Sequence, residues 1–189
     1  MKVNERELPN ICDVHTIVFD FDGIFTNNKV WVNQSGVESV CCDRGDGFAF
    51  DLLRAFKKIN NNNVPNILIL SKEKNSVVLE RAKKLKIDCK FGVQDKLKYM
   101  KDFFSDSRPS NSDPFKGLIY LGNDLNDFLI MKEAGFSVAP IDAHPRIIDI
   151  ADLVIPIKGG DGFVRVFMEN FLRLQTLNEG EFYELISNC

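Results

Sequence analysis

Residues 16–26 read TIVFDFDGIFT, an apolar run that leads directly into two acidic residues and a glycine. Ile17, Val18 and Phe19 form a continuous apolar segment, which is typical of a central parallel strand buried on both faces. Such a strand places Asp20 at the carboxyl end of the sheet, the edge where ligands bind in open α/β folds. The stretch therefore predicts an α/β fold with a binding site at this edge.

Asp20 and Asp22 lie too close together for both carboxylates to be ionised without a compensating charge. A divalent cation would supply that charge, and Gly23 would let the backbone turn sharply around a phosphoryl group. The alternative interpretation is a solvated strand end followed by an ordinary turn. The two acidic residues and the glycine alone would favour this alternative, and three later segments of the chain change the balance.

Strand and helix patterns alternate along the chain. Apolar runs predict further strands at residues 67–70, 89–91, 118–121, 137–139 and 153–155. Helical periodicity predicts helices at residues 48–56, 77–85, 96–104 and 128–134, with Asp46 placed to cap the first. Polar residues 60–63 and 105–114 predict a break and a surface loop. The alternation indicates a Rossmann-like three-layer fold with a central parallel sheet and right-handed crossovers.

A β-hairpin is predicted after the first strand, at about residues 29–42. Residues 33–36 read NQSG between two short β-type segments, which is a hairpin signal. Its valines would expose an apolar face on a small monomer, so we expect the hairpin to pack against another subunit. The alternative is a hairpin that packs on its own domain.

Composition excludes several classes of protein. The 189 residues include 24 basic and 27 acidic side chains, with no long basic run of the kind that nucleic-acid binding requires. No apolar stretch is long enough to span a bilayer, and no signal-peptide core follows the charged start, so we expect a cytoplasmic protein that binds no membrane. Five cysteines without a CxxC pair and only two histidines predict free thiols and favour a hard, oxygen-liganded metal over zinc.

Two single residues add weaker signals. Ser71 directly follows the predicted strand 67–70, where its hydroxyl could donate to a phosphoryl oxygen; helix capping is the alternative. Lys96 opens a predicted helix, where a cation opposes the helix dipole and therefore favours an anionic partner. The alternative for Lys96 is a solvated surface lysine.

Residues 121–127 read LGNDLND and again follow a strand. Asn123, Asp124 and Asp127 offer several hard oxygen ligands beside the first carboxylate pair. A polar turn with a helix cap would account for Asn126 or Asp127, but it accounts less well for the whole cluster.

These four segments, in this order, resemble the haloacid dehalogenase-like phosphotransferase superfamily. The resemblance covers about residues 14–172 and continues through DRGDGFA (43–49), KNSVV (74–78), RAKKL (81–85), GVQDK (92–96), APIDAHP (139–145) and GGDG (159–162). These motifs are similar to a subgroup that contains 3-deoxy-D-manno-octulosonate 8-phosphate phosphatases and nonulosonate (N-acylneuraminate) 9-phosphate phosphatases.

The resemblance implies a role for each matching residue. Asp20 would be the nucleophile that forms an aspartyl-phosphate, Asp22 the acid and then the base, and Lys96 the neutralising cation. Phosphate or substrate would be bound by Gly23, Thr26, Ser71, Lys72 and Arg44. Mg²⁺ would be held by Asp20, the backbone carbonyl of Asp22, Asn123, Asp124 and Asp127.

The chain departs from the family pattern at two places. Asn123 stands where the family usually has an aspartate, which lowers the charge of the metal site. Ser71, Lys72 and Glu73 replace the Thr-Gly-Arg of the octulosonate enzymes. The replacement removes a cation and favours a sialic-acid-type (nonulosonate) substrate. Lys72 or Lys74 could compensate for that cation.

The resemblance further implies one domain over residues 1–189 without a cap domain, enclosed in a homotetramer by the hairpin and by a neighbour's tail, residues 179–189. We expect a Mg²⁺-dependent phosphatase that acts on a nonulosonate 9-phosphate or an octulosonate 8-phosphate and feeds cell-surface glycan or lipopolysaccharide synthesis. Two other classes stay open: a catalytically weak oligomerisation module that works with a CMP-sialic acid type synthetase, and a receiver domain that is phosphorylated without rapid turnover.

Overall fold

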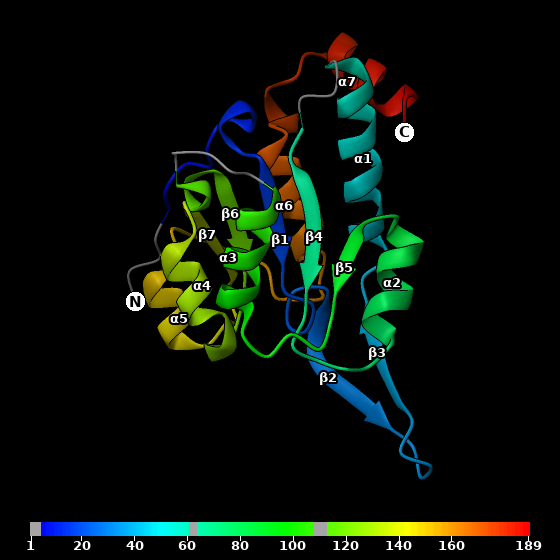
Figure 1. Ribbon diagram of the computed structural model, residues 1–189. Helices are drawn as coiled ribbons and strands as arrows, with labels where there is room; N and C mark the ends of the chain where they lie inside the picture. Colours follow the sequence, from blue (N-terminus) through cyan, green and yellow to red (C-terminus); the bar gives the residue numbers. More distant parts are fainter. Residues whose placement is uncertain (1–4, 61–63, 108–112) are drawn as a thin grey trace.

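The computed structural model describes residues 5–60, 64–107 and 113–189. Its centre is a six-stranded parallel sheet in the order β5-β4-β1-β6-β7-β8 (Figure 1). The strands are β1 (Thr16–Phe19), β4 (Asn66–Leu70), β5 (Asp88–Lys90), β6 (Leu118–Leu121), β7 (Phe136–Pro140) and β8 (Leu153–Ile155). All four residues of β1 are buried, which confirms the central strand predicted from its apolar run.

Successive side chains of the central strands point to opposite faces of the sheet, and each face carries its own core. On one face, Ile17 and Phe19 pack in the cluster covered by α1 (Gly45–Ile59), α2 (Val77–Leu85), α6 (Phe163–Phe171) and α7 (Glu179–Ser187). On the other face, Val18 packs in the cluster covered by α3 (Lys96–Ser107), α4 (Phe128–Glu133) and α5 (Pro145–Ile150). The predicted three-layer α/β architecture is therefore confirmed.

Short 3₁₀ helices complete the connections: η1 (Ile11–Asp13), η2 (Pro114–Gly117), η3 (Leu125–Asp127) and η4 (Leu174–Thr176). The pattern did not predict α5, α6 or α7. The predicted loop at residues 105–114 is partly wrong, because α3 continues to Ser107 and η2 begins at Pro114. Residues 108–112 of that loop and residues 61–63 of the polar break lie outside the described residues. No helix in the described part of the chain has the length and apolar character needed to cross a membrane.

The predicted hairpin is present as β2 (Thr26–Val32) and β3 (Glu38–Cys42), paired antiparallel and extending away from the sheet (Figure 1). Asn33 closes its turn, since the Asn33 side-chain oxygen accepts hydrogen bonds from the backbone N–H groups of Ser35 and Val37. Val30, Trp31 and Val32 are 53%, 74% and 61% exposed, so the hairpin presents an apolar surface that its own domain does not cover.

Asp46 does not cap its own helix, and the prediction that it does is wrong. Its side chain lies fully buried in the first turn of α1, and Oδ1 accepts a hydrogen bond of 3.0 Å from the backbone N–H of Arg165 in α6. The Oδ2 atom has no hydrogen-bond partner among the described residues. Burial raises the pKa of Asp46 to about 7, although the Arg165 hydrogen bond acts in the opposite direction.

This raised pKa predicts how stability depends on pH. The carboxyl group ionises at a lower pH in the unfolded chain, so its contribution to stability falls as the pH rises from about 4 to about 7. Asp46→Asn removes the charge and keeps an acceptor oxygen. We expect the free energy of unfolding of this variant, relative to wild type, to improve by up to about 3 kcal/mol between pH 5 and pH 8. Urea unfolding at both pH values measures the free energy of unfolding of the variant and of the wild type. If the difference between the two proteins is the same at pH 5 and pH 8, the raised pKa is contradicted.

Candidate active site

The register of the parallel strands brings the predicted site residues to one edge of the sheet. Phe19 at the end of β1 is level with Ile69 of β4 and Leu121 of β6. Asp20 follows Phe19 directly, and Ser71 and Asn123 come two positions after Ile69 and Leu121, so all three lie at the carboxyl edge. Asp20 continues the ladder, because its backbone N–H donates to the carbonyl of Leu121 at 2.9 Å.

A cavity of about 570 Å³ opens at this edge. Its floor carries six of the predicted residues: Asp20, Asp22, Ser71, Lys72, Asn123 and Asp124. The hairpin contributes Val30, Glu38 and Val40 to the lining, next to the segment 73–78, where Asn75 Nδ2 donates to Glu38 Oε2 at 3.1 Å. The predicted hairpin therefore borders the cavity.

Asp20 and Lys96 form a buried ion pair, with Lys96 Nζ 2.7 Å from Asp20 Oδ1. The backbone N–H of Phe21 donates to the same carboxylate oxygen at 2.7 Å. Burial and the nearby Asp127 raise the pKa of Asp20 to about 7, against the lowering effect of Lys96. Burial alone would lower the pKa of Lys96, but the two carboxylates outweigh it and raise that pKa. Lys96 is therefore not a solvated surface lysine.

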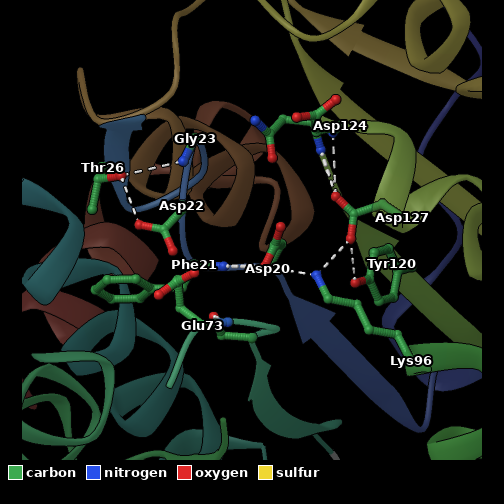
Figure 2. A network of polar contacts seen from close by, with 12 residues as sticks. Asp20, Phe21, Asp22, Gly23, Thr26, Glu73, Lys96, Tyr120, Asp124 and Asp127 are labelled. Atoms are coloured by element: carbon green, nitrogen blue, oxygen red, sulfur yellow. Dashed lines mark hydrogen bonds and ion pairs between the residues drawn. The ribbon is translucent and has the colours of Figure 1, made fainter. Parts of the chain in front are cut away.

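Asp127 receives hydrogen bonds on both of its carboxylate oxygens (Figure 2). Oδ1 accepts from Lys96 Nζ at 2.7 Å and from the Tyr120 hydroxyl at 2.8 Å. Oδ2 accepts from the backbone N–H groups of Asn123 at 3.0 Å and Asp124 at 3.3 Å. These four donors occupy the lone pairs that a metal would need. Metal ligation by Asp127 stays a prediction, and the contacts favour a role in positioning Lys96.

Tyr120 is a site residue that the sequence reasoning missed. It lies in β6, is fully buried, and bonds the same Asp127 oxygen as Lys96. A tyrosine in an otherwise aliphatic buried strand needs a partner for its hydroxyl, which is the signal that could have identified it.

Asp22 is half-buried beside the cavity, and Thr26 holds its loop. Thr26 Oγ1 accepts a hydrogen bond of 3.2 Å from the backbone N–H of Gly23 and contacts Asp22 Oδ1 at 3.5 Å (Figure 2). It also accepts a hydrogen bond of 3.2 Å from the backbone N–H of Asn28. Burial and the charge of Glu73 raise the pKa of Asp22, which favours the protonated form that an acid requires. Thr26 is fully buried and does not line the cavity, so phosphate binding by Thr26 itself stays a prediction.

Gly23 allows the loop after β1, residues 20–25, to approach the segment after β6; because this loop carries Asp20 and Asp22, we call it the catalytic loop. Its φ of +82° favours glycine, and a Cβ at this position would overlap the side chain of Asn123. Asn123 itself is buried, and its Oδ1 atom has no hydrogen-bond partner within the described ranges. An unpartnered buried carbonyl oxygen facing this edge is an available ligand for a cation.

The donor set fits a hard divalent cation. Asp20, Asp22 and Asn123 offer oxygen atoms around one cavity, and Asp124 adds a carboxylate that also caps η3, with Oδ1 accepting from the Leu125 N–H. In the described segments no group of three His, Cys, Asp or Glu side chains is arranged around a metal position. The Asn123 amide would therefore complete the set. The described cysteines are free, as predicted.

Ser71 and Arg44 have different surroundings. Ser71 is buried at the cavity, and its Oγ accepts a hydrogen bond of 3.1 Å from the backbone N–H of Glu73, so it does not cap α2. Arg44 is exposed at the start of α1 and lines a separate hollow with Arg54 and Arg81. Substrate binding by Arg44 stays a prediction.

The ion pair predicts a large effect of Lys96→Met on stability in metal-free buffer. The change leaves the Asp20 and Asp127 carboxylates buried without their cation, so we expect a loss of about 3–5 kcal/mol at pH 8. The loss should be smaller at pH 5, where Asp20 with its raised pKa is protonated. Urea unfolding with EDTA measures it, and the exposed neighbour variant Lys98→Met is the control. Equal stability of the two variants would contradict the buried pair.

Comparisons with known proteins show similarity over most of the chain. The chain is 28% identical over 164 residues to the 3-deoxy-D-manno-octulosonate 8-phosphate phosphatase of Salmonella typhi, covering 86% of this chain and 81% of that protein. It is 27% identical over 179 residues to the Yersinia pestis phosphatase of the same name, covering 94% and 90%. No family model matches the chain.

Among solved structures, a putative HAD family hydrolase from Streptomyces avermitilis superposes with a TM-score of 0.79 at 32% identity, covering 92% of this chain and 95% of that one. The Yersinia pestis 3-deoxy-D-manno-octulosonate 8-phosphate phosphatase superposes with a TM-score of 0.74 at 25% identity, covering 92% and 86%.

Proposed function

The chain belongs to the haloacid dehalogenase-like (HAD) hydrolase family as a sugar phosphatase, and on this premise we propose that it removes the terminal phosphate of an eight- or nine-carbon 2-keto sugar acid with the help of Mg²⁺. The observation that carries the proposal is the buried Asp20 carboxylate, 2.7 Å from Lys96 Nζ and open to a cavity of about 570 Å³ that Asp22 also lines. A nucleophile, a cation and a second carboxyl group are thus gathered where a phosphoryl group would bind.

In the proposed first step, an Asp20 oxygen attacks phosphorus and the bond from phosphorus to the sugar oxygen breaks. Asp22 gives its proton to that leaving oxygen. In the second step, a water oxygen attacks phosphorus, Asp22 takes the water proton, and the bond from Asp20 to phosphorus breaks. Lys96 offsets negative charge in both steps, and the Ser71 hydroxyl is placed to donate to a phosphoryl oxygen.

Mg²⁺ would be held by Asp20, the Asp22 backbone carbonyl, Asn123 and Asp124, and it would neutralise charge on the phosphoryl oxygens. We assign Asp127 to a different task. Its contacts with Lys96, Tyr120 and two backbone N–H groups support a positioning role, in which it orients the lysine toward Asp20.

For the sugar, we propose nonulosonate 9-phosphate ahead of octulosonate 8-phosphate. The support is Glu73, which lines the cavity at the place where the octulosonate pattern has a cation. Together with this function we propose a cytoplasmic location and a role in cell-surface glycan synthesis. We also propose that residues 1–189 form one domain without a cap.

Phosphate release from nonulosonate 9-phosphate, octulosonate 8-phosphate and glucose 6-phosphate, with Mg²⁺ or EDTA, tests the function. We expect Mg²⁺-dependent release with the highest kcat/KM for the nine-carbon substrate. Asp22→Asn should lower kcat by about 10²–10⁴-fold because proton transfer is lost, and Asp20→Asn should remove turnover because an amide is a poor nucleophile. The exposed variant Asp102→Asn is the control.

Two outcomes would overturn parts of this proposal. Near-normal turnover by Asp20→Asn would exclude the covalent mechanism. Absence of release from every substrate with ample Mg²⁺ would favour the alternative of a catalytically weak module, for which Asn123 in the metal segment is the specific support.

We also propose a homotetramer in which the hairpin packs against a neighbouring subunit. The exposed Val30, Trp31, Val32 and Val37 support it, because an apolar edge of this kind invites association. The tail forms α7, which packs against α1 far from its own hairpin (Figure 1), so any contact of the tail with a catalytic cavity would involve a neighbour.

Light scattering after size exclusion measures the assembly. We expect a tetramer for the wild type and a smaller species for Trp31→Ser, because the change removes apolar contact area from the hairpin. Leu129→Ser, at an exposed apolar residue of α4, is the matched control and should stay tetrameric. A fully active wild-type monomer at micromolar concentration would refute the assembly.

A further inference from the structure

Asp46 is a buried carboxyl group that no step of the proposed mechanism uses. It belongs to α1, yet its side-chain oxygen Oδ1 accepts a hydrogen bond from the backbone of α6, 119 positions later in the chain. The charged groups that face it are Asp43, Arg81 and Arg165, and none of the ion pairs found among the described residues includes Asp46. Its contact is therefore directed at a backbone group.

That backbone group is an N–H in the first turn of α6, where no carbonyl of the same helix is available as an acceptor. Gly162 occupies the N-cap position and has no side chain to bond the first turn. Arg165 is the third residue of the helix, so its N–H has no partner within the helix. Asp46 Oδ1 accepts from this N–H at 3.0 Å and so replaces the missing cap from a distant part of the chain. A carboxylate at this position also interacts favourably with the helix dipole.

The turn directly before α6 packs on the catalytic loop. The backbone N–H of Gly160 donates to the carbonyl of Ile24 at 3.1 Å. A Cβ at Gly159 would overlap the carbonyl of Gly23, so the two backbones are in close contact. Gly23 and Ile24 are the two residues that follow Asp22, and any shift of this turn therefore reaches the acid of the site.

We infer that Asp46 is a positioning residue: by capping α6 it holds the turn of residues 158–162 against the loop that carries Asp22. The path runs from Asp46 to Arg165, through the Gly159–Gly160 backbone, to Gly23 and Ile24. Without the cap, the first turn of α6 is free to fray. The catalytic loop then loses the packing of Gly159 and Gly160 against Gly23 and Ile24. Only the kinetic part of the test rests on the proposed phosphatase function.

The kinetic test compares Asp46→Ala with Asp46→Asn. We expect Asp46→Ala to lower kcat by about tenfold with KM changed less than about twofold, because the substrate pocket is kept while Asp22 is misplaced. Asp46→Asn keeps an oxygen that can accept from the Arg165 N–H, and it should rescue kcat to within about twofold of wild type. Unchanged kcat in Asp46→Ala, or no rescue by Asp46→Asn, would overturn the inference.

Asp152→Ala is the matched control. Asp152 also accepts hydrogen bonds from a distant backbone N–H, that of Ser137 at 2.9 Å, but it does so next to β8 at one edge of the sheet. We expect this variant to lose stability and to keep the wild-type kcat. A fall in kcat equal to that of Asp46→Ala would show that general destabilisation explains the effect, and it would overturn the positioning role.

Hydrogen exchange of the Gly160 amide, followed by NMR, tests the inference without any activity. We expect exchange to be about tenfold faster in Asp46→Ala than in wild type, and unchanged in Asp46→Asn and Asp152→Ala. Equal protection in Asp46→Ala and wild type would refute the coupling.

If Asp46→Ala does not fold, Asp46→Ser takes its place, because the shorter serine side chain reaches less far. The expected results are the same. A protein inactive on every substrate but with this exchange pattern would leave the inference standing and refute only the proposed function.

Discussion

A buried ammonium group between two buried carboxylates is the interaction on which the catalytic edge depends. Lys96 Nζ lies 2.7 Å from Asp20 Oδ1 and 2.7 Å from Asp127 Oδ1, and all three side chains are almost completely buried. Removing any one of them from water is costly without the other two, so the three segments that carry them must meet. The end of β1, the start of α3 and the end of η3 are thereby held at one point.

Small residues permit this meeting. Gly23 lies against the Asn123 side chain, and a Cβ at Gly122 would fall 2.7 Å from the carboxyl carbon of Asp127. Gly159 in turn touches the Gly23 backbone. Backbone segments can approach this closely only where no side chain intervenes, so the glycines set the spacing between the segment after β6, the loop after β1 and the turn before α6.

The three carboxyl groups at this edge differ in their partners, and the partners separate their proposed tasks. Asp20 faces both Lys96 and the cavity, which suits a nucleophile. Asp22 is half-buried, forms no ion pair with a described residue, and has a raised pKa that suits proton transfer. Asp127 is bonded on both oxygens and is not among the described residues that line the cavity, which suits a fixed support.

The sequence by itself determined the sheet, its carboxyl edge and most of the residues gathered there. Apolar runs identify buried parallel strands, and parallel strands end at a common edge, so Asp20, Ser71 and Asn123 could be grouped without coordinates. Only the tertiary structure decided the contacts of Asp127, Tyr120 and Asp46. Lys96 and Asp127 are 31 positions apart and Asp46 and Arg165 are 119 apart. A hydrogen bond between such distant residues leaves no local pattern, because its geometry exists only once the chain has packed.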